Sequence, residues 1–213
     1  MPSRILLIEG SSTSSPDGGI AQPPGPVTPY HVIYMCDTSA LNRPTSYINF
    51  ATGGETLSTI SGRTARVLAA FAPPPVLNVL SLQLGQNDFV STTGPYANNV
   101  PGWVTDVQAL LATYRTGAGG NLLKIGLTTQ NPRSDATFLG TRAAVNTAIR
   151  ELVKCGNADF LIDWAVDPTY GQDADVSDAT KYPDGTHPSQ ANQNNMEALY
   201  YKPALNVFCG PSA

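Results

Sequence analysis

The sequence predicts an α/β fold in which a parallel sheet of about five strands carries helices on both faces. Five short runs are continuously apolar, which is typical of strands buried on both sides. Between these runs, apolar residues recur at the spacing of an α-helix. Turn-forming residues follow each run, so strands and helices alternate along the chain, and this alternation favours parallel pairing.

The expected strands occupy residues 5–8, 46–50, 76–84, 122–127 and 160–164. Helices are expected over residues 55–71, 104–114, 137–154 and 189–207. The first of these helices ends before Pro73, Pro74 and Pro75, which cannot continue it. Residues 10–30 and 165–188 are rich in Gly, Pro, Asp, Ser and Thr, and loops of that length are uncommon unless they carry function.

The composition is that of a weakly charged globular domain. The chain has 213 residues and a mass of 22.5 kDa, which predicts a single domain over residues 1–213. Hydrophobic residues make up 41%, so a core can form, and a charged share of 13% does not indicate disorder, because disordered chains combine low hydrophobicity with high net charge. A net charge of −4 without any Lys/Arg run argues against nucleic-acid and anionic-membrane partners.

The sequence lacks the patterns of membrane-spanning segments and of signal peptides. No apolar stretch approaches the roughly 20 residues that span a bilayer, so we expect no integral membrane association. The apolar run at residues 5–8 is too short for the core of a signal peptide. We therefore expect a soluble protein, whose compartment and oligomeric state the sequence leaves open.

The three cysteines, Cys36, Cys155 and Cys209, match no metal-binding spacing and are too few for a disulfide framework. One pair could form, with Cys155 and Cys209 the better candidates. Free buried thiols are the common alternative.

Polar segments lie where an open parallel sheet places its active site, beyond the carboxyl ends of the strands. Residues 9–13 follow the first expected strand and residues 85–88 follow the third. Residues 51–56 follow the second strand, and residues 184–189 precede the last helix. These four segments contain the candidate catalytic residues.

His187 is the best candidate for a general base. Such a histidine needs its ring held in one tautomer, usually by a carboxylate on Nδ1, and Asp184 can fold back across one turn to do this. Pro188 suits the first turn of a helix and gives the base a rigid anchor. The only other histidine, His31, has no carboxylate nearby in the sequence, and we interpret it as structural.

Ser12 is the natural nucleophile for this base. A serine attacks well only when a base removes its proton, and Ser12 comes just past a buried strand. Taken alone, it fits a polar turn or a helix cap better, as most serines do. Ser11, Ser14 and Ser15 are rivals by proximity.

Two residues are candidates for stabilising an oxyanion. Acyl transfer develops negative charge on a carbonyl oxygen, which N–H donors aimed at it stabilise. The Asn87 amide lies at the end of the third strand, and Gly54 lies in the loop after the second, where its backbone N–H can approach closely. Each alone reads as a turn or a helix start, but four such residues at four expected site segments are unlikely to coincide by chance.

These segments resemble the consensus blocks of the SGNH, or GDSL, hydrolases. Ser12 matches the nucleophile of the first block, Gly54 the glycine of the second, and Asn87 the asparagine of the Gly-x-Asn-Asp block. Asp184 and His187 match the Asp-x-x-His pair of the last block. The resemblance implies a flavodoxin-like three-layer α/β/α sandwich with about five parallel strands.

Two positions depart from the family pattern. The first block usually reads Gly-Asp-Ser, and here Ser11 stands where aspartate is expected. That aspartate is not the acid of the triad, so its loss bears on how the nucleophile loop is held. In the second block, Gly53 can take the role given to Gly54, and Ala51 replaces the block's first glycine.

The resemblance implies a serine esterase that forms an acyl-enzyme and needs no metal or organic cofactor. Its catalytic residues would be Ser12, Asp184 and His187, and its oxyanion donors Ser12, Gly54 and Asn87. The expected substrate is a small ester with a short acyl chain or an acylated carbohydrate, with acetyl groups on sugars the leading choice. The alternative from another class is a carbohydrate- or surface-binding module that no longer catalyses, which the Ser11 departure favours.

Two further patterns bear on ligands. Aromatic residues in or near the expected loops can stack on sugar faces or simply pack at the base of the loops: Tyr30, Tyr34, Tyr96, Trp103 and Tyr170. The acidic residues Asp173, Asp175 and Asp178 could bind calcium, but their spacing lacks the glycine and distal glutamate of an EF-hand loop. We interpret them as a solvated acidic loop.

Overall fold

Five apolar strands form one parallel sheet in the order β4-β1-β5-β6-β7. The computed structural model describes residues 3–14, 21–22, 25–37, 44–90 and 94–208. The strands are β1 (Arg4–Gly10), β4 (Ser46–Asn49), β5 (Leu77–Gln83), β6 (Leu122–Thr128) and β7 (Phe160–Ile162). Among these five, the spatial order 2-1-3-4-5 is the flavodoxin-like order, and the predicted strands agree with the observed ones to within three residues at each end.

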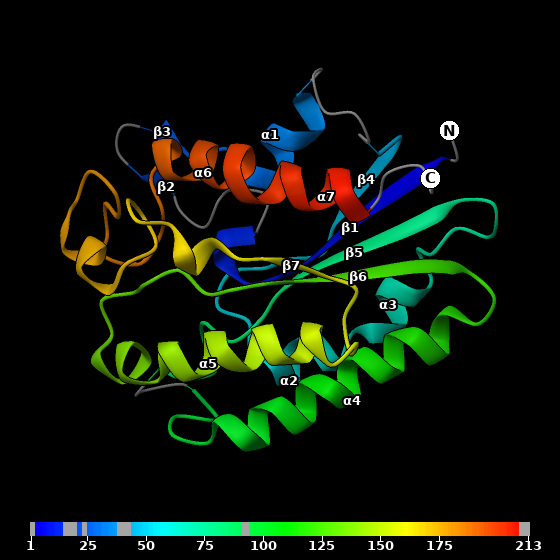
Figure 1. The fold of residues 1–213 in the computed structure, drawn as a ribbon, viewed down its shortest axis with the longest axis horizontal. Coiled ribbons are helices and arrows are strands. Elements are labelled where there is room, and N and C mark those ends of the chain that lie inside the picture. Colours follow the sequence, from blue (N-terminus) through cyan, green and yellow to red (C-terminus); the bar gives the residue numbers. More distant parts are fainter. Residues whose placement is uncertain (1–2, 15–20, 23–24, 38–43, 91–93, 209–213) are drawn as a thin grey trace.

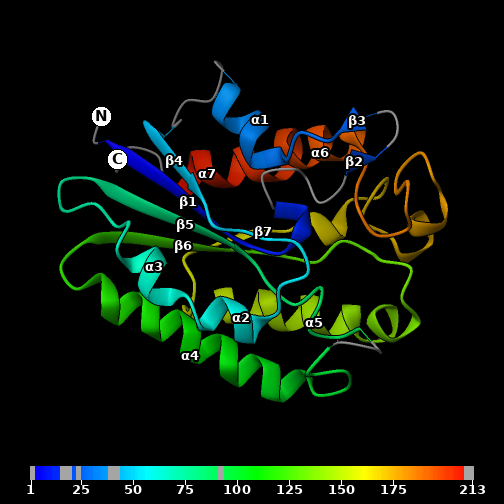
Figure 2. The ribbon, with the colours of Figure 1, turned by 180° about the vertical axis from the view of Figure 1, so that it is seen from behind.

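Helices cover both faces of the sheet, which confirms the predicted three-layer α/β/α arrangement (Figures 1 and 2). One face carries α1 (Tyr30–Cys36), α6 (Gln190–Met196) and α7 (Lys202–Phe208). A π-helical turn, η4 (Glu197–Tyr201), joins α6 to α7. The other face carries α2 (Leu57–Ser61), α3 (Thr64–Leu68), α4 (Val100–Ala118) and α5 (Ala136–Lys154).

The continuous apolar runs arise because both faces of the central strands are buried. Along β1, Leu7 packs into the cluster beneath α2–α5, whereas Leu6 and Ile8 pack beneath α1, α6 and α7. All three side chains are fully buried. The carboxyl ends of β1, β4 and β5 meet at one edge of the sheet, because these strands are parallel neighbours.

One predicted helix is wrong as a single element. Instead of one helix over residues 55–71, the structure has α2 and α3, which are separated by Gly62 and Arg63. Arg63 leaves the helical conformation, with φ −116° and ψ 14°, and its side chain turns toward acidic residues at the strand ends. Apolar spacing does not distinguish two short helices in sequence from one long helix.

The sequence did not predict several short helices and strands. Helix α1 follows Pro29 and buries Tyr30, His31 and Tyr34, but at seven residues it is too short to show a clear period. A two-residue pairing of β2 (Ala21–Gln22) with β3 (Gly25–Pro26) lies within the long segment 10–30. Within the segment 165–188, the structure has the short 3₁₀ helix η3 (Asp173–Ser177), and η2 (Trp164–Val166) lies at its start.

None of the described helices combines the length and apolar character needed to cross a membrane.

Candidate active site

Ser12 begins a short 3₁₀ turn, η1 (Ser12–Ser14), directly after β1. The side chain lies at the sheet edge and is 9% exposed. Its Oγ is 2.7 Å from Nε2 of His187, which is 175 residues away in the sequence. The two residues that the sequence analysis proposed as nucleophile and base are therefore in hydrogen-bond contact.

Asp184 holds the other side of the imidazole. Its Oδ2 lies 2.7 Å from Nδ1 of His187, and its Oδ1 accepts the backbone N–H groups of His187 at 2.7 Å and Thr186 at 3.0 Å. Partial burial would raise the pKa of the Asp184 carboxyl, but these hydrogen bonds together hold it below its ordinary value. An ionised carboxylate only accepts hydrogen bonds, so Nδ1 carries the proton and Nε2 is left to accept from Ser12.

The loop that carries Asp184 and His187 packs against the segment that follows β6. The backbone N–H of Ser134 donates to the carbonyl oxygen of Gly185 at 2.6 Å, and Nδ2 of Asn131 donates to the carbonyl of Thr186 at 3.2 Å. Gly185 has φ +71°, a conformation that glycine adopts without strain. Helix α6 then begins at Gln190, with Ser189 as its N-cap.

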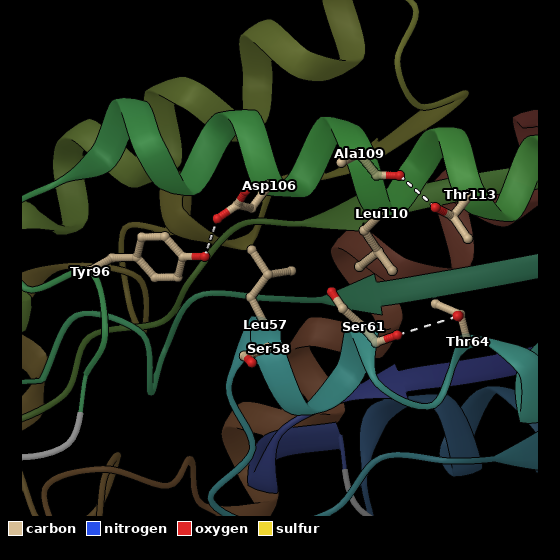
Figure 3. A pocket seen from close by; sticks show the side chains of 9 residues that line it. All are labelled: Leu57, Ser58, Ser61, Thr64, Tyr96, Asp106, Ala109, Leu110 and Thr113. Atoms are coloured by element: carbon tan, nitrogen blue, oxygen red, sulfur yellow. Dashed lines mark hydrogen bonds between the residues drawn. The ribbon is translucent and has the colours of Figure 1, made fainter.

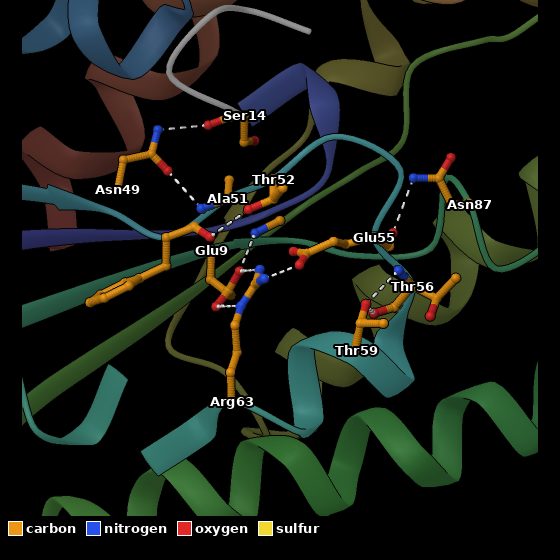
Figure 4. A network of polar contacts seen from close by, with 12 residues as sticks. Glu9, Ser14, Asn49, Ala51, Thr52, Glu55, Thr56, Thr59, Arg63 and Asn87 are labelled. Atoms are coloured by element: carbon orange, nitrogen blue, oxygen red, sulfur yellow. Dashed lines mark hydrogen bonds and ion pairs between the residues drawn. The ribbon is translucent and has the colours of Figure 1, made fainter. Parts of the chain in front are cut away.

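The turn that carries Ser12 is held in place by hydrogen bonds to Ser14, one of which is drawn in Figure 4. The Ser14 carbonyl accepts Nδ2 of Asn49 at 2.8 Å and Nε2 of His31 at 2.9 Å. The Ser14 hydroxyl donates to Oε1 of Gln83 at 2.6 Å and lies 3.0 Å from the Tyr30 hydroxyl. Ser14 is thus committed to structural bonds, which removes it as a rival nucleophile.

His31 is a structural residue, which confirms its interpretation from the sequence. Burial lowers the pKa of its imidazole to about 3, so the ring is neutral. Its Nε2 faces the Ser14 carbonyl and therefore carries the proton, and Nδ1 accepts from the Tyr47 hydroxyl at 2.9 Å. Two alternative nucleophiles remain from the sequence analysis. Ser11 is buried and its hydroxyl, which has no hydrogen-bond partner among the described residues, does not contact a base; Ser15 lies outside those residues.

The Asn87 amide is held from both ends. Its Nδ2 donates to the backbone carbonyl of Glu55 at 3.0 Å, and its Oδ1 accepts Nη1 of Arg133 at 2.8 Å. An amide nitrogen has two N–H groups, and within the described residues only one of them is bonded, so the other can bind a ligand. Arg133 was not predicted from the sequence. It lies beyond the carboxyl end of β6, and because sites of parallel sheets form beyond the carboxyl ends of strands, this segment could also have been singled out.

The two glycines after β4 differ in their surroundings. Gly54 has φ +80°, and a Cβ added there would meet no atom within 4 Å, so its conformation rather than space calls for glycine. A Cβ added to Gly53 would lie 3.7 Å from Cβ of Ser12. Gly53 therefore lies beside the candidate nucleophile, and both glycines stay candidates for the backbone donor.

Asp88 joins the Asn87 turn to two helices. Its Oδ1 accepts the backbone N–H of Leu57 at 2.9 Å, and its Oδ2 accepts Nε1 of Trp103 at 3.2 Å. Burial raises the pKa of the Asp88 carboxyl to about 6, although these donors oppose the shift. The residue next to Asn87 thus fixes the start of α2 and the first turns of α4.

A groove of about 360 Å³ lies between α2 and α4 (Figure 3). Tyr96 closes one end of it and donates its hydroxyl hydrogen to the Asp106 carboxylate. The groove is lined by hydroxyl, carboxylate and aliphatic side chains: Leu57, Ser58, Ser61, Thr64, Tyr96, Asp106, Ala109, Leu110 and Thr113. Ser12 and His187 do not line it.

The structure sorts the aromatic residues that could stack on a sugar. Tyr30, Tyr34 and Trp103 are at most 1% exposed and pack in the core. The prediction that they could stack on a sugar is therefore wrong for these three. Tyr96 lines the groove of Figure 3, and Tyr170 is half-buried beside Lys181.

The acidic residues of the segment 165–188 are used in local bonds. Asp173 pairs with Arg142, and Asp175 pairs with Lys181 at 2.7 Å. The Asp178 carboxylate accepts the Thr180 hydroxyl at 2.6 Å. In the part of the chain that the structure describes, no three His, Cys, Asp or Glu side chains come together in a way that could hold a metal ion.

Two of the cysteines are exposed free thiols, Cys36 at the end of α1 and Cys155 after α5. The expectation of buried thiols is wrong for these two. Because the Cys155 thiol is free, the structure does not contain the predicted Cys155–Cys209 disulfide, and Cys209 itself lies outside the described residues.

Comparison with known proteins gives a family and a fold. The model of the family described as GDSL-like lipase/acylhydrolase matches residues 16–199, a span that begins just after η1 and includes Asn87, Asp184 and His187. No curated protein sequence matches the chain.

Several solved structures share the fold. The acetylxylan esterase Axe2 from Geobacillus stearothermophilus is 18% identical with a TM-score of 0.62, over 99% of this chain and 96% of that one. A member of the lipolytic G-D-S-L family from Veillonella parvula is 17% identical with a TM-score of 0.63, over 98% and 100%. A GDSL-like lipase from Bacteroides thetaiotaomicron is 15% identical with a TM-score of 0.65, over 92% and 85%.

Proposed function

The chain belongs to the GDSL-like lipase/acylhydrolase family, and we propose that it hydrolyses carboxylic esters through an acyl-enzyme on Ser12. The observation that carries the proposal is the unbroken hydrogen-bond chain from Ser12 through His187 to Asp184, with both imidazole contacts at 2.7 Å. A nucleophile needs an adjacent base, and the base needs a group that fixes its tautomer. Each condition has a residue to meet it.

In the acylation step, Oγ of Ser12 attacks the ester carbonyl carbon while Nε2 of His187 takes the hydroxyl proton. The Asp184 carboxylate stabilises the imidazolium that forms, and its lowered pKa keeps it ionised. The tetrahedral intermediate then collapses, the bond to the alcohol oxygen breaks, and His187 returns the proton to the leaving alcohol. Water, deprotonated by His187, next attacks the acyl-serine; the bond to Oγ of Ser12 then breaks, His187 returns the proton to this oxygen, and the carboxylic acid leaves.

The oxyanion of each intermediate would be bound by the backbone N–H groups of Ser12 and Gly54 and by the Asn87 amide. In support, the Glu55 carbonyl and Arg133 fix the amide plane, and the second N–H of Nδ2 has no partner in the described part of the chain. The Arg133 guanidinium on Oδ1 draws electron density from the amide and makes that N–H a better donor. Donors fixed before the reaction need no reorganisation when the charge develops.

For the substrate we propose a short acyl ester, with an acetyl group on a carbohydrate as the leading case. Axe2, which has the same fold, is described as an acetylxylan esterase.

The proposal is tested by turnover of 4-nitrophenyl acetate, butyrate and octanoate, together with acetate release from acetylated xylan. We expect the acetyl ester to be the best of the three and xylan to be deacetylated. A fluorophosphonate probe should label the wild-type protein at Ser12, whereas Ser12→Ala should remain unlabelled and Ser177→Ala, on η3, should label normally. Absence of labelling and turnover in the wild-type protein would instead favour the non-catalytic binding module.

A further inference from the structure

Arg63 bridges two acidic residues beneath the candidate active site (Figure 4). Its Nε donates to Oε2 of Glu9 at 3.0 Å, and its Nη2 contacts Oε1 of the same carboxylate. Its Nη1 pairs with the Glu55 carboxylate. The Glu9 side chain is fully buried, and the side chains of Arg63 and Glu55 are 18% and 16% exposed.

Stability alone is a weak reason for such a cluster. Removing charged groups from water carries a desolvation cost, and replacing a buried ion pair with apolar residues of similar size is often neutral or stabilising. Here two carboxylates share one guanidinium, and Oε2 of Glu55 has no hydrogen-bond partner among the described residues. The cluster therefore calls for a role beyond stability.

Each carboxylate belongs to a segment of the candidate site. Glu9 precedes Ser12 by three residues at the end of β1, and its Oε1 also accepts the backbone N–H of Gly10 at 3.0 Å. Glu55 follows Gly54 directly, and its backbone carbonyl accepts Nδ2 of Asn87 at 3.0 Å. Arg63 thus connects the strand beneath the nucleophile to the residue that orients the oxyanion amide.

The local backbone is arranged to deliver Arg63 to this position. Helix α2 ends at Ser61 with Gly62 as its C-cap, and Arg63 lies outside the helical conformation between α2 and α3. The opposite end of α2 is fixed by a capping box, in which the Thr56 N–H donates to the Thr59 hydroxyl at 2.9 Å. Glu55 is therefore held from both sides, by α2 through the chain and by Arg63 through its side chain.

The nucleophile segment has no comparable acidic anchor at position 11. Ser11 stands where the family pattern has aspartate, and its buried hydroxyl makes no hydrogen bond within the described part of the chain. The carboxylate that ties this segment to the rest of the site lies two residues earlier, at Glu9.

We propose that Arg63 is a positioning residue of the oxyanion site: by bridging Glu9 and Glu55 it sets the placement of the Asn87 amide relative to Ser12. The inference rests on the proposed esterase function. Because the oxyanion develops only in the transition state, loosening its donors lowers kcat and changes KM little.

The first test compares Arg63→Gln and Arg63→Lys with the control Arg115→Gln on 4-nitrophenyl acetate. Arg115 pairs with Asp159 at 3.1 Å, at the start of β7 on the opposite edge of the sheet. Arg63→Gln should lower kcat at least tenfold with KM within threefold, and Arg63→Lys should recover part of the loss. Arg115→Gln should keep wild-type kcat. An unchanged kcat in folded Arg63→Gln would overturn the inference.

A double-mutant cycle shows whether Arg63 acts through Asn87. Asn87→Ala should lower kcat about 10²–10³-fold, as expected for one oxyanion donor. If the two residues act together, adding Arg63→Gln to Asn87→Ala should cost less than threefold more. Fully multiplicative losses would assign Arg63 a general structural role and overturn the inference.

A thionoester substrate gives a readout that a merely structural defect would not move. Sulfur accepts hydrogen bonds weakly, so replacing the carbonyl oxygen should slow the wild-type enzyme more than Arg63→Gln. If Arg63→Gln does not fold, Glu55→Gln replaces it, since this variant keeps the Arg63–Glu9 pair and weakens only the bridge to Glu55. If Ser12→Ala retains full activity, the proposed function fails; if Ser12→Ala is inactive and the bridge variants are normal, only the positioning role fails.

Discussion

The two sides of the candidate triad are held by different means. On the nucleophile side, the turn Ser12–Ser14 is anchored by side chains from three other elements: Asn49 of β4, Gln83 of β5, and Tyr30 and His31 of α1. These contacts are buried or partly buried, and they come from residues far apart in the sequence. On this side, two strands and helix α1 together hold the turn in place.

On the base side, Asp184 and His187 are held mainly by their own turn. Three of the hydrogen bonds to Asp184 come from residues two or three positions later. The segment is irregular, and its side chains are partly exposed. The base side is therefore a local motif carried on a loop, whereas the nucleophile side depends on contacts between distant parts of the fold. The two sides should therefore respond differently to substitution.

The largest effect is expected where the two sides meet. Ser12→Ala and His187→Ala should each lower kcat by about 10⁶-fold, because each removes the attacking pair as a unit. For the same reason, the double variant should be no slower than either single variant. Single-turnover rates with 4-nitrophenyl acetate measure this. Losses that multiply in the double variant would show that the two residues do not act as one unit.

The next effect belongs to the base side alone. Asp184→Asn should lower kcat by about 10⁴-fold, because an amide N–H can face Nδ1 and favour the wrong imidazole tautomer. The loop should keep its shape, since an asparagine oxygen can still accept the N–H groups of Thr186 and His187. Equal thermal midpoints for the variant and the wild type would verify this. Asp178→Asn, in the preceding loop, is the matched control and should retain kcat.

On the nucleophile side, loss of an anchor should affect stability and activity together. Asn49→Ala removes the donor to the Ser14 carbonyl and should lower the free energy of unfolding by about 1–3 kcal/mol. It should also lower kcat by about tenfold, because the turn that carries Ser12 loses one of its four anchoring side chains. Asn78→Ala is the control: Asn78 is fully buried and makes three hydrogen bonds near the start of β5, so it should lose stability but keep kcat. Equal kcat in both variants would contradict a fold-dependent nucleophile side.

This contrast also explains what the sequence could predict. Asp184 and His187 were identified from their spacing, because the interaction between them is local. The five strands were found because burial on both faces leaves a continuous apolar run. The single-domain assignment over residues 1–213 stays a prediction.

The residues that orient the site could not be found in the same way. Arg63 and Arg133 contact partners 54 and 46 residues away, and no local pattern records such contacts. The break between α2 and α3 lies at Gly62, the C-cap of α2, and at Arg63, whose side chain pairs with Glu9 and Glu55. Propensity and spacing specify elements, whereas the long-range polar contacts appear only once the sheet has formed.

The smallest effect on catalysis is expected at Asp88, which supports the Asn87 turn without facing the reacting atoms. Its folded-state pKa of about 6 lies above the ordinary value of 3.8, so the native state binds this proton more tightly than the unfolded chain does. The stabilisation from this group is fully present below about pH 4 and is lost as the pH rises through 6. A shift of about two units corresponds to up to about 3 kcal/mol.

Asp88→Asn removes this titration and can still accept the Leu57 N–H. The free energy of unfolding of Asp88→Asn should therefore rise relative to that of the wild type between pH 4 and pH 7, by up to about 3 kcal/mol. Urea unfolding at several pH values in this window measures the difference, and the raised pKa of Glu9, caused by burial, cancels because both proteins contain it. A constant difference across the window would show that Asp88 is ionised throughout. In that case its hydrogen bonds to Leu57 and Trp103 outweigh burial, and the Asn87 turn rests on a charged support.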